Sequence, residues 1–177
     1  MKKSHVFVIA ALSLTALSGC FMSEVPRVET GTMFARGPVA FCSPDEEKCQ
    51  IGIPSGDGYV VESEDANEED IRLRFEPLTE ADGVTVYLGE IELREGDESA
   101  WAYLVARPST GFINDAPRIE IIMPGCRDLP HDREAEYGIS RSDPYTCLVT
   151  DLAGLRTYLT SAYGEKFASD AWWAGED

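Results

Sequence analysis

Histidine and the carboxylates are the side chains in this sequence that could support acid–base catalysis. After the first 19 residues there is one histidine, His131, which lies among acids in Asp128-Leu-Pro-His131-Asp-Arg-Glu134. A loop histidine of this kind could be a general base or a metal ligand, but more often it is a surface residue with a raised pKa. The motifs of serine hydrolases, phosphate-binding loops and zinc proteases are absent from the sequence. We therefore predict no catalytic residue and a protein that is not an enzyme; a hydrolase using His131 is the least favoured alternative.

The N-terminus has the order of an export signal. Lys2 and Lys3 precede an apolar run of twelve residues, Val6 to Leu17, which is shorter than the roughly 20 residues of a membrane-spanning helix. The next residues, Leu17-Ser18-Gly19-Cys20, resemble the lipobox of bacterial lipoproteins. In that family the cysteine thiol receives diacylglycerol, the signal is cut just before it, and the new amino group is often acylated.

This resemblance implies that Cys20 carries a lipid and holds the protein to a membrane that it does not span. Two or three buried acyl chains, at roughly 0.8 kcal/mol per CH₂, give a stable anchor. In enteric bacteria an aspartate directly after the lipidated cysteine resembles a signal for retention in the inner membrane. This chain has Phe21 at that position, so we favour the periplasmic side of the outer membrane. We divide the chain into a signal peptide (1–19), a lipidated tether (20–37) and a single globular domain (38–177). The tether is predicted because this segment lacks periodicity and contains Pro26, Gly31 and Gly37.

Four cysteines follow Cys20: Cys42, Cys49, Cys126 and Cys147. In an oxidising compartment an even number of cysteines predicts disulfides, here two, with three possible connectivities. Proximity in sequence favours Cys42 with Cys49 and Cys126 with Cys147. Because there is no Cys-x-x-Cys pair and His131 is alone, a zinc site or a redox pair is disfavoured. We predict no metal and no cofactor.

The chain is strongly acidic, with 15 Lys+Arg against 32 Asp+Glu and a formal net charge of −17. This charge repels phosphate backbones, so we exclude nucleic acid as a partner. The densest acidic run is Glu62 to Asp70. It suggests a calcium-binding site, because Asp65, Asn67, Glu69 and Glu76 match the first, third, fifth and twelfth positions of an EF-hand loop. However, Asp70 stands where that loop needs glycine, and we interpret the run as a solvated loop.

Alternating apolar and polar residues between short polar turns predict antiparallel strands. The clearest run places Ile71, Leu73 and Phe75 on one face. The other runs are 38–42 and 49–53, which form a disulfide-clipped hairpin, then 59–62, 84–88, 101–106 and 118–123. After Gly89 the apolar positions change phase, which predicts a bulge or bend.

One segment has helical spacing instead. Leu152, Leu155, Leu159 and Tyr163 follow the possible N-caps Thr150 and Asp151, and Gly164 supplies a stop. Trp172 and Trp173 follow near the end of the sequence. They either belong to a second short helix packed on the body or form an exposed aromatic pair, and we favour the packed helix. The predicted fold class is α+β: a bent antiparallel β-meander of six to seven strands with one C-terminal amphipathic helix and two disulfides.

The leading functional hypothesis is a non-enzymatic envelope lipoprotein that binds or supports another envelope component, possible partners being an envelope protein and the membrane. The alternative is a carrier of a small ligand or cation that uses the acidic loop or a concavity of the sheet. Six aromatic residues could line such a concavity, although a core would need them too: Tyr59, Phe75, Tyr87, Trp101, Tyr103 and Phe112.

Overall fold

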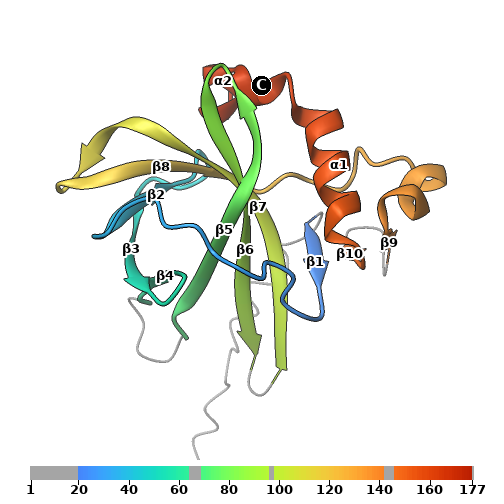
Figure 1. Cartoon of the computed structure of the whole chain (residues 1–177), viewed down its shortest axis with the longest axis horizontal. Helices are drawn as coiled ribbons and strands as arrows, with labels where there is room; N and C mark the ends of the chain where they lie inside the picture. The colour runs from blue at the N-terminus through green and yellow to red at the C-terminus, as the bar shows by residue number, and fades with distance from the viewer. Residues whose placement is uncertain (1–19, 64–68, 96–97, 142–145, 177) are drawn as a thin grey trace, which may run out of the picture.

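A closed β-barrel forms the centre of the molecule (Figure 1). The computed structural model describes residues 20–63, 69–95, 98–141 and 146–176. Seven strands follow each other around the barrel in the order β6–β5–β4–β3–β2–β8–β7, and pairing of β6 with β7 closes it. These strands are β2 (Val39–Cys42), β3 (Gln50–Ser55), β4 (Gly58–Val61), β5 (Ile71–Ala81), β6 (Val84–Glu95), β7 (Glu98–Ile113) and β8 (Ala116–Ile122).

Three short strands continue the sheet outward from β7. They are β1 (Phe21–Ser23), β10 (Cys147–Val149) and β9 (Ile139–Arg141), in that spatial order. The α+β class is confirmed in broad terms, but the predicted meander is wrong. The sheet closes on itself, and β2–β8 and β1–β10 are parallel pairs that join segments far apart in the sequence.

Aromatic side chains fill the barrel. Phe41, Tyr59 and Phe75 are buried inside it, with ring centroids 5.4–6.4 Å apart. Phe34 enters the same cluster and packs on Phe75 and Tyr87, at 4.8 Å from each ring. The barrel interior is therefore a packed core, as expected for a barrel with so few strands.

A second core lies outside the barrel, between β6, β7 and helix α1 (Leu152–Tyr163). The helix prediction is confirmed: the Asp151 carboxylate accepts a hydrogen bond from the Ala153 N–H at 3.0 Å, and Leu155, Leu159 and Tyr163 are buried. Two 3-10 helices flank it, η1 (His131–Tyr137) and η2 (Lys166–Ala168), and η2 leads to α2 (Asp170–Trp173). None of the described helices is long and apolar enough to cross a membrane.

The tryptophan pair docks on the body, as favoured from the sequence. Trp172 and Trp173 are buried, and the Trp173 indole N–H donates to the Phe167 carbonyl at 3.0 Å. Arg107 lies over the Trp173 ring and forms ion pairs with Glu120 and Asp170. These contacts fix α2 to β7 and β8.

Both disulfides have the predicted connectivity, Cys42–Cys49 and Cys126–Cys147. The first joins the ends of β2 and β3, which pair as the expected antiparallel hairpin. The second joins the loop after β8 to β10 and lies in the core beneath α1.

The predicted bulge at Gly89 is wrong, because the register runs unbroken through Phe75↔Gly89 and Gly89↔Leu104. The change of phase has another cause. Val86 and Leu88 face the outer core under α1, whereas Ile91 packs against the barrel interior. Glycine is needed at position 89 because a Cβ there would lie 2.4 Å from a methyl of Leu104. The register irregularity of β5 falls at Pro77–Thr79 instead.

The segment 20–37, expected to be a tether, lies on the barrel in this structure. Phe21 is fully buried under α1, Val28 is buried, and Phe34 enters the barrel cluster. The Thr32 N–H donates to the Phe75 carbonyl at 2.6 Å. Single apolar residues attach this segment to the body, and they pack against different elements. Because they are not regularly spaced, they leave no periodic pattern in the sequence, which is why the segment resembles a tether.

Candidate functional site

Cys20 is built into the sheet. Its carbonyl accepts a hydrogen bond from the Cys147 N–H at 3.1 Å, and it forms a β-bridge with Gly125. In the full chain Cys20 is 6% exposed, and burial raises the pKa of its thiol. The other residues of the predicted lipobox, 17–19, and the signal 1–16 lie outside the described residues.

A buried carboxylate holds the segment that follows β1. Glu90 is 3% exposed, and its Oε1 accepts hydrogen bonds from the Arg27 N–H (2.7 Å), the Val28 N–H (3.4 Å) and the Tyr103 hydroxyl (3.2 Å). The Tyr103 hydroxyl also lies 2.8 Å from the Ser23 hydroxyl. Desolvation raises the pKa of Glu90, although these donors and Arg74 oppose the shift. Burial likewise raises the pKa of Tyr103.

The aromatic residues proposed to line a concavity are not brought together around an open cavity. Tyr59, Phe75 and Tyr87 belong to the barrel core, and Tyr103 lies in the outer core. The Tyr59 hydroxyl accepts from the Phe34 and Ala35 N–H groups at 2.8 and 3.0 Å, which fixes the segment carrying Phe34 over the barrel interior.

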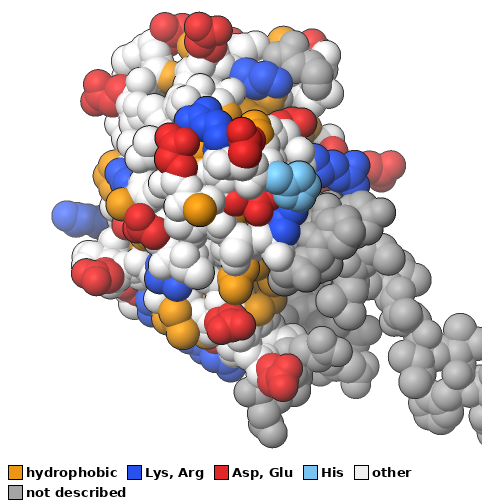
Figure 2. All heavy atoms as spheres, turned by 90° about the vertical axis from the view of Figure 1, so that its right-hand side faces the viewer, with side chains coloured by type: hydrophobic (Ala, Val, Ile, Leu, Met, Phe, Trp, Pro, Cys, Tyr) orange, Lys and Arg blue, Asp and Glu red, His pale blue; other side chains and the backbone are white. Residues whose placement is uncertain are grey.

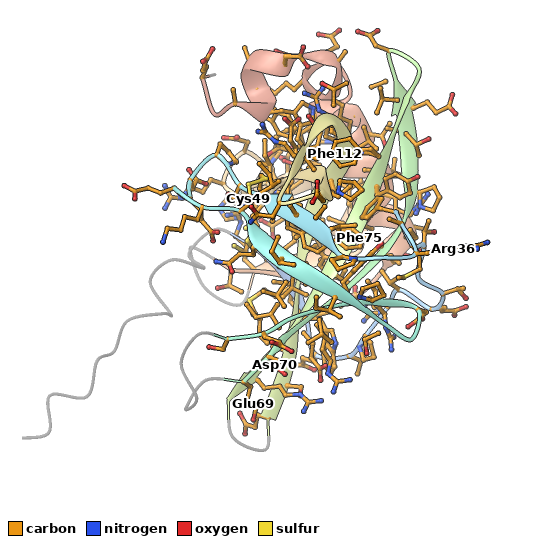
Figure 3. The ribbon with its side chains drawn as sticks, turned by 90° about the vertical axis from the view of Figure 1, so that its left-hand side faces the viewer. Arg36, Cys49, Glu69, Asp70, Phe75 and Phe112 are labelled. Atoms are coloured by element: carbon orange, nitrogen blue, oxygen red, sulfur yellow. A yellow bond between two sulfur atoms is a disulfide. The ribbon has the colours of Figure 1, made fainter. Side chains whose placement is uncertain are left out.

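The remaining two aromatic residues lie elsewhere. Trp101 is half-buried at the pairing of β7 with β1. Phe112 is 70% exposed near the tip of the β7–β8 hairpin, whereas Phe75 lies within the ribbon (Figure 3). The sheet concavity predicted from these residues therefore has no common lining.

His131 starts η1 and is open to solvent, with its side chain 79% exposed. Its Nδ1 lies 2.8 Å from the Glu134 carboxylate, which also receives the Arg141 guanidinium at 2.5 Å. The Arg141 hydrogen bond is the main cause of a lowered pKa for Glu134. Arg141 further donates to the Cys126 and Leu129 carbonyls. This geometry makes His131 a surface residue attached to a structural ion pair, with no enclosed space beside it among the described residues.

The acidic loop lies only in part within the described residues. Asp65 and Asn67 fall outside them, while Glu69 pairs with Arg94 at 3.8 Å and Glu76 pairs with Arg156. Glu69 and Asp70 lie at the end of the barrel far from Phe112 (Figure 3). Within the part of the chain that the structure describes, no three metal-ligating side chains come together.

A cavity of about 340 Å³ lies between η1 and α1, and we call it the tyrosine pocket. Figure 2 views the side of the molecule on which these elements lie, where acidic, basic and hydrophobic side chains are intermixed. The pocket is lined by Asp128, Pro130, Arg133, Tyr137, Tyr158, Ser161, Ala162, Tyr163 and Lys166. Its size is at the lower end of the range for small-molecule sites.

Three buried tyrosines form the wall of this pocket. The ring of Tyr158 lies 5.4 Å from that of Tyr137 and 6.2 Å from that of Tyr163. The Tyr163 hydroxyl donates to the Gly125 carbonyl at 3.0 Å, and the Tyr137 hydroxyl accepts from Arg133.

The Tyr158 hydroxyl is buried and makes no hydrogen bond of ordinary geometry with a described residue. The Tyr163 hydroxyl nevertheless lies close enough for a weak hydrogen bond, which lowers the pKa of Tyr158 and opposes the effect of burial. Burial raises the pKa of both Tyr158 and Tyr163, and Asp128 adds to the effect. These phenols therefore stay protonated and can donate hydrogen bonds to a ligand. A buried hydroxyl without a partner costs about 1–3 kcal/mol, which a bound polar group could recover.

The tyrosine pocket adjoins the predicted lipid attachment site. Tyr163 bonds to Gly125, which is the bridge partner of Cys20, and the Phe21 ring lies 5.5 Å from that of Tyr158. Sequence reasoning missed this pocket because it treated Tyr163 only as part of the helix core. The five-residue spacing of Tyr158 and Tyr163, together with Tyr137 in the disulfide loop, was the available signal.

The chain matches no family model, no curated protein and no solved structure.

Proposed function

We propose that the protein is a lipid-anchored envelope protein that faces the periplasm and binds or supports another envelope component without catalysis. The observation that carries this proposal is the sequence Leu17-Ser18-Gly19-Cys20 after a basic start and an apolar run. Cys20 directly precedes β1, so an anchor at this residue would hold a rigid body at the membrane.

The first experiment tests the anchor. Cys20→Ala should move the protein from the membrane to the soluble fraction and abolish labelling with a palmitate analogue. The double variant Cys42→Ala/Cys49→Ala also removes cysteines but leaves Cys20 intact, so it should remain labelled and sediment with membranes. A Cys20→Ala protein that still carries the label would refute the lipid assignment. Separation of the two membranes on a density gradient tests our preference for the outer membrane.

The tyrosine pocket is our candidate for the site that contacts the partner. It is the place where buried polar groups, Arg133 and Lys166 line a common space. A photoreactive amino acid at Ser161 should crosslink the partner in cells, whereas the same group at Glu80, an exposed residue of β5, should not. Recovery of uncrosslinked monomer alone from both positions would count against a partner at this pocket.

Carriage of a small ligand is the second candidate function, and the tyrosine pocket favours it over the packed barrel. A ligand that binds there should raise the melting temperature of the wild-type protein, because it stabilises the folded state alone. Tyr158→Phe removes the buried hydroxyl and should reduce this rise in melting temperature. If no member of a lipid and metabolite panel changes the melting temperature, the carrier function fails while the anchor proposal is unaffected.

A further inference from the structure

The strands beside Cys20 have two unlike faces. Phe21, Cys147, Val149 and Ile139 point into the core under α1. Because side chains alternate along a strand, Cys20, Met22, Leu148 and Ser140 lie on the opposite side, which we call the anchor face. Met22 pairs with Leu148, and Leu148 pairs with Ser140, so these three residues form a row across β1, β10 and β9.

The apolar residues of the anchor face lie outside the cores that the described residues form. Met22 and Leu148 are both half-buried, and among the described residues neither packs against a cluster of buried side chains. They lie in register on neighbouring strands. Met22 is two residues after Cys20, and Leu148 follows Cys147, whose N–H binds the Cys20 carbonyl.

This face is also free of strand acids in a protein rich in them. The sequences of β1, β9 and β10 contain one charged residue, Arg141, and no Asp or Glu. Arg141 is turned to the other side, where it binds Glu134 and two carbonyls. An anionic lipid surface attracts basic side chains and repels acidic ones, so a face without acids can approach lipid at a lower electrostatic cost than an acidic face.

There is no spacer between Cys20 and the body. If residues 20–37 were extended, at roughly 3.3 Å per residue the body could move about 60 Å from its anchor. Instead β1 begins at the next residue, and the Cys20 carbonyl is bonded to Cys147. Glu90 holds Arg27 and Val28 a few residues later. An acyl chain on Cys20 would therefore be attached at a fixed point of the sheet.

We infer that the anchor face rests directly on the lipid bilayer, so that the body is held in one orientation with α1 turned away from the membrane. This inference rests on the proposed lipidation of Cys20 and adds to it the surface that contacts lipid. The occupant is the bilayer because the face surrounds the point from which acyl chains would enter it.

The test uses the full, lipidated protein in vesicles of zwitterionic and anionic phospholipid. An environment-sensitive fluorophore is attached at Ser140→Cys on the anchor face or, as the matched control, at Thr157→Cys, an exposed residue of α1. Lipids bearing a nitroxide quencher should reduce the fluorescence several-fold more at position 140 than at position 157. Glu90→Ala should loosen the segment that follows β1, so that quenching at positions 140 and 157 becomes similar. The control Glu80→Gln should preserve the difference in quenching between the two positions.

The outcomes separate the two proposals. Protein that fails to float with the vesicles overturns the lipid anchor and, with it, the orientation. Protein that floats but is quenched equally at positions 140 and 157 keeps its anchor and overturns the docked orientation alone. A second pair of variants tests the same orientation independently. Leu148→Glu puts a charge on the anchor face and should reduce quenching at position 140, whereas the control Thr160→Glu, on α1, should not.

Discussion

Replacing Glu90 tests whether one carboxylate holds the N-terminal segment on the barrel. Glu90→Ala removes the acceptor of the Arg27 and Val28 N–H groups and of the Tyr103 hydroxyl. Each buried hydrogen bond to a charged acceptor is worth about 1.5–3 kcal/mol. One of the three is long, and removal of a buried charge offsets part of the loss. We expect Glu90→Ala to lower the free energy of unfolding by about 3 kcal/mol.

Glu90→Gln separates the hydrogen bonds from the charge. All three donors point to Oε1, and the amide oxygen of glutamine can accept from all of them. We expect its stability at neutral pH to equal or exceed that of the wild type. With a urea m-value of about 2 kcal/mol/M, Glu90→Ala should lower the unfolding midpoint by about 1.5 M. If Glu90→Gln lost as much stability as Glu90→Ala, the hydrogen-bond argument would be refuted.

The same residue contributes to the pH dependence of stability. Its pKa is raised in the folded state above the ordinary value of 4.5, so the folded protein binds the proton more tightly than the unfolded chain. The stability that protonated Glu90 contributes is therefore fully present below pH 4.5, and it is lost as the pH rises through the pKa of Glu90 in the folded protein. The stability of Glu90→Gln relative to the wild type should increase from pH 4.5 upward. A difference that stays constant with pH in urea titrations would contradict the raised pKa.

Three further substitutions test the packing, each by urea unfolding. Cys126→Ala/Cys147→Ala should cost about 3 kcal/mol, because it opens a long loop, and reductant should then have a smaller effect than on the wild type. Gly89→Ala should cost about 1–3 kcal/mol by overpacking against Leu104, whereas Gly37→Ala, with open space around it, should cost little. Phe34→Ala should cost about 2 kcal/mol, less than the 3–5 kcal/mol of a fully buried phenylalanine, since Phe34 is half-buried.

The parts of the fold that sequence reasoning predicted are those with short-range signals. The alternation of Ile71, Leu73 and Phe75 predicted β5, and the spacing of Leu155 and Leu159 with an aspartate cap predicted α1. Proximity alone was enough for the two disulfides, since each closes a local loop.

The errors arose where long-range pairing decides the structure. Closure of the barrel depends on β6 pairing with β7 and on the parallel pair β2–β8, neither of which leaves a local pattern. The change of phase at Gly89 suggests a bulge, but an unbroken strand produces the same pattern when different faces of its two halves are buried. This is the case in β6, where Val86 and Leu88 face the outer core and Ile91 packs against the barrel interior. The tyrosine pocket was missed for a similar reason, as its wall combines Tyr137 with residues of α1.

The parallel pairing of β1 with β10 sets an order of events during biogenesis. Among the described residues β1 is the first strand, but it pairs with β10, which lies more than 120 residues later in the sequence. β1 therefore cannot complete its hydrogen bonds until residues 147–149 have been made. Contacts of such large sequence separation form slowly. During that interval β1, and the Cys20 carbonyl that accepts from the Cys147 N–H, have no strand partner from the C-terminal part of the chain.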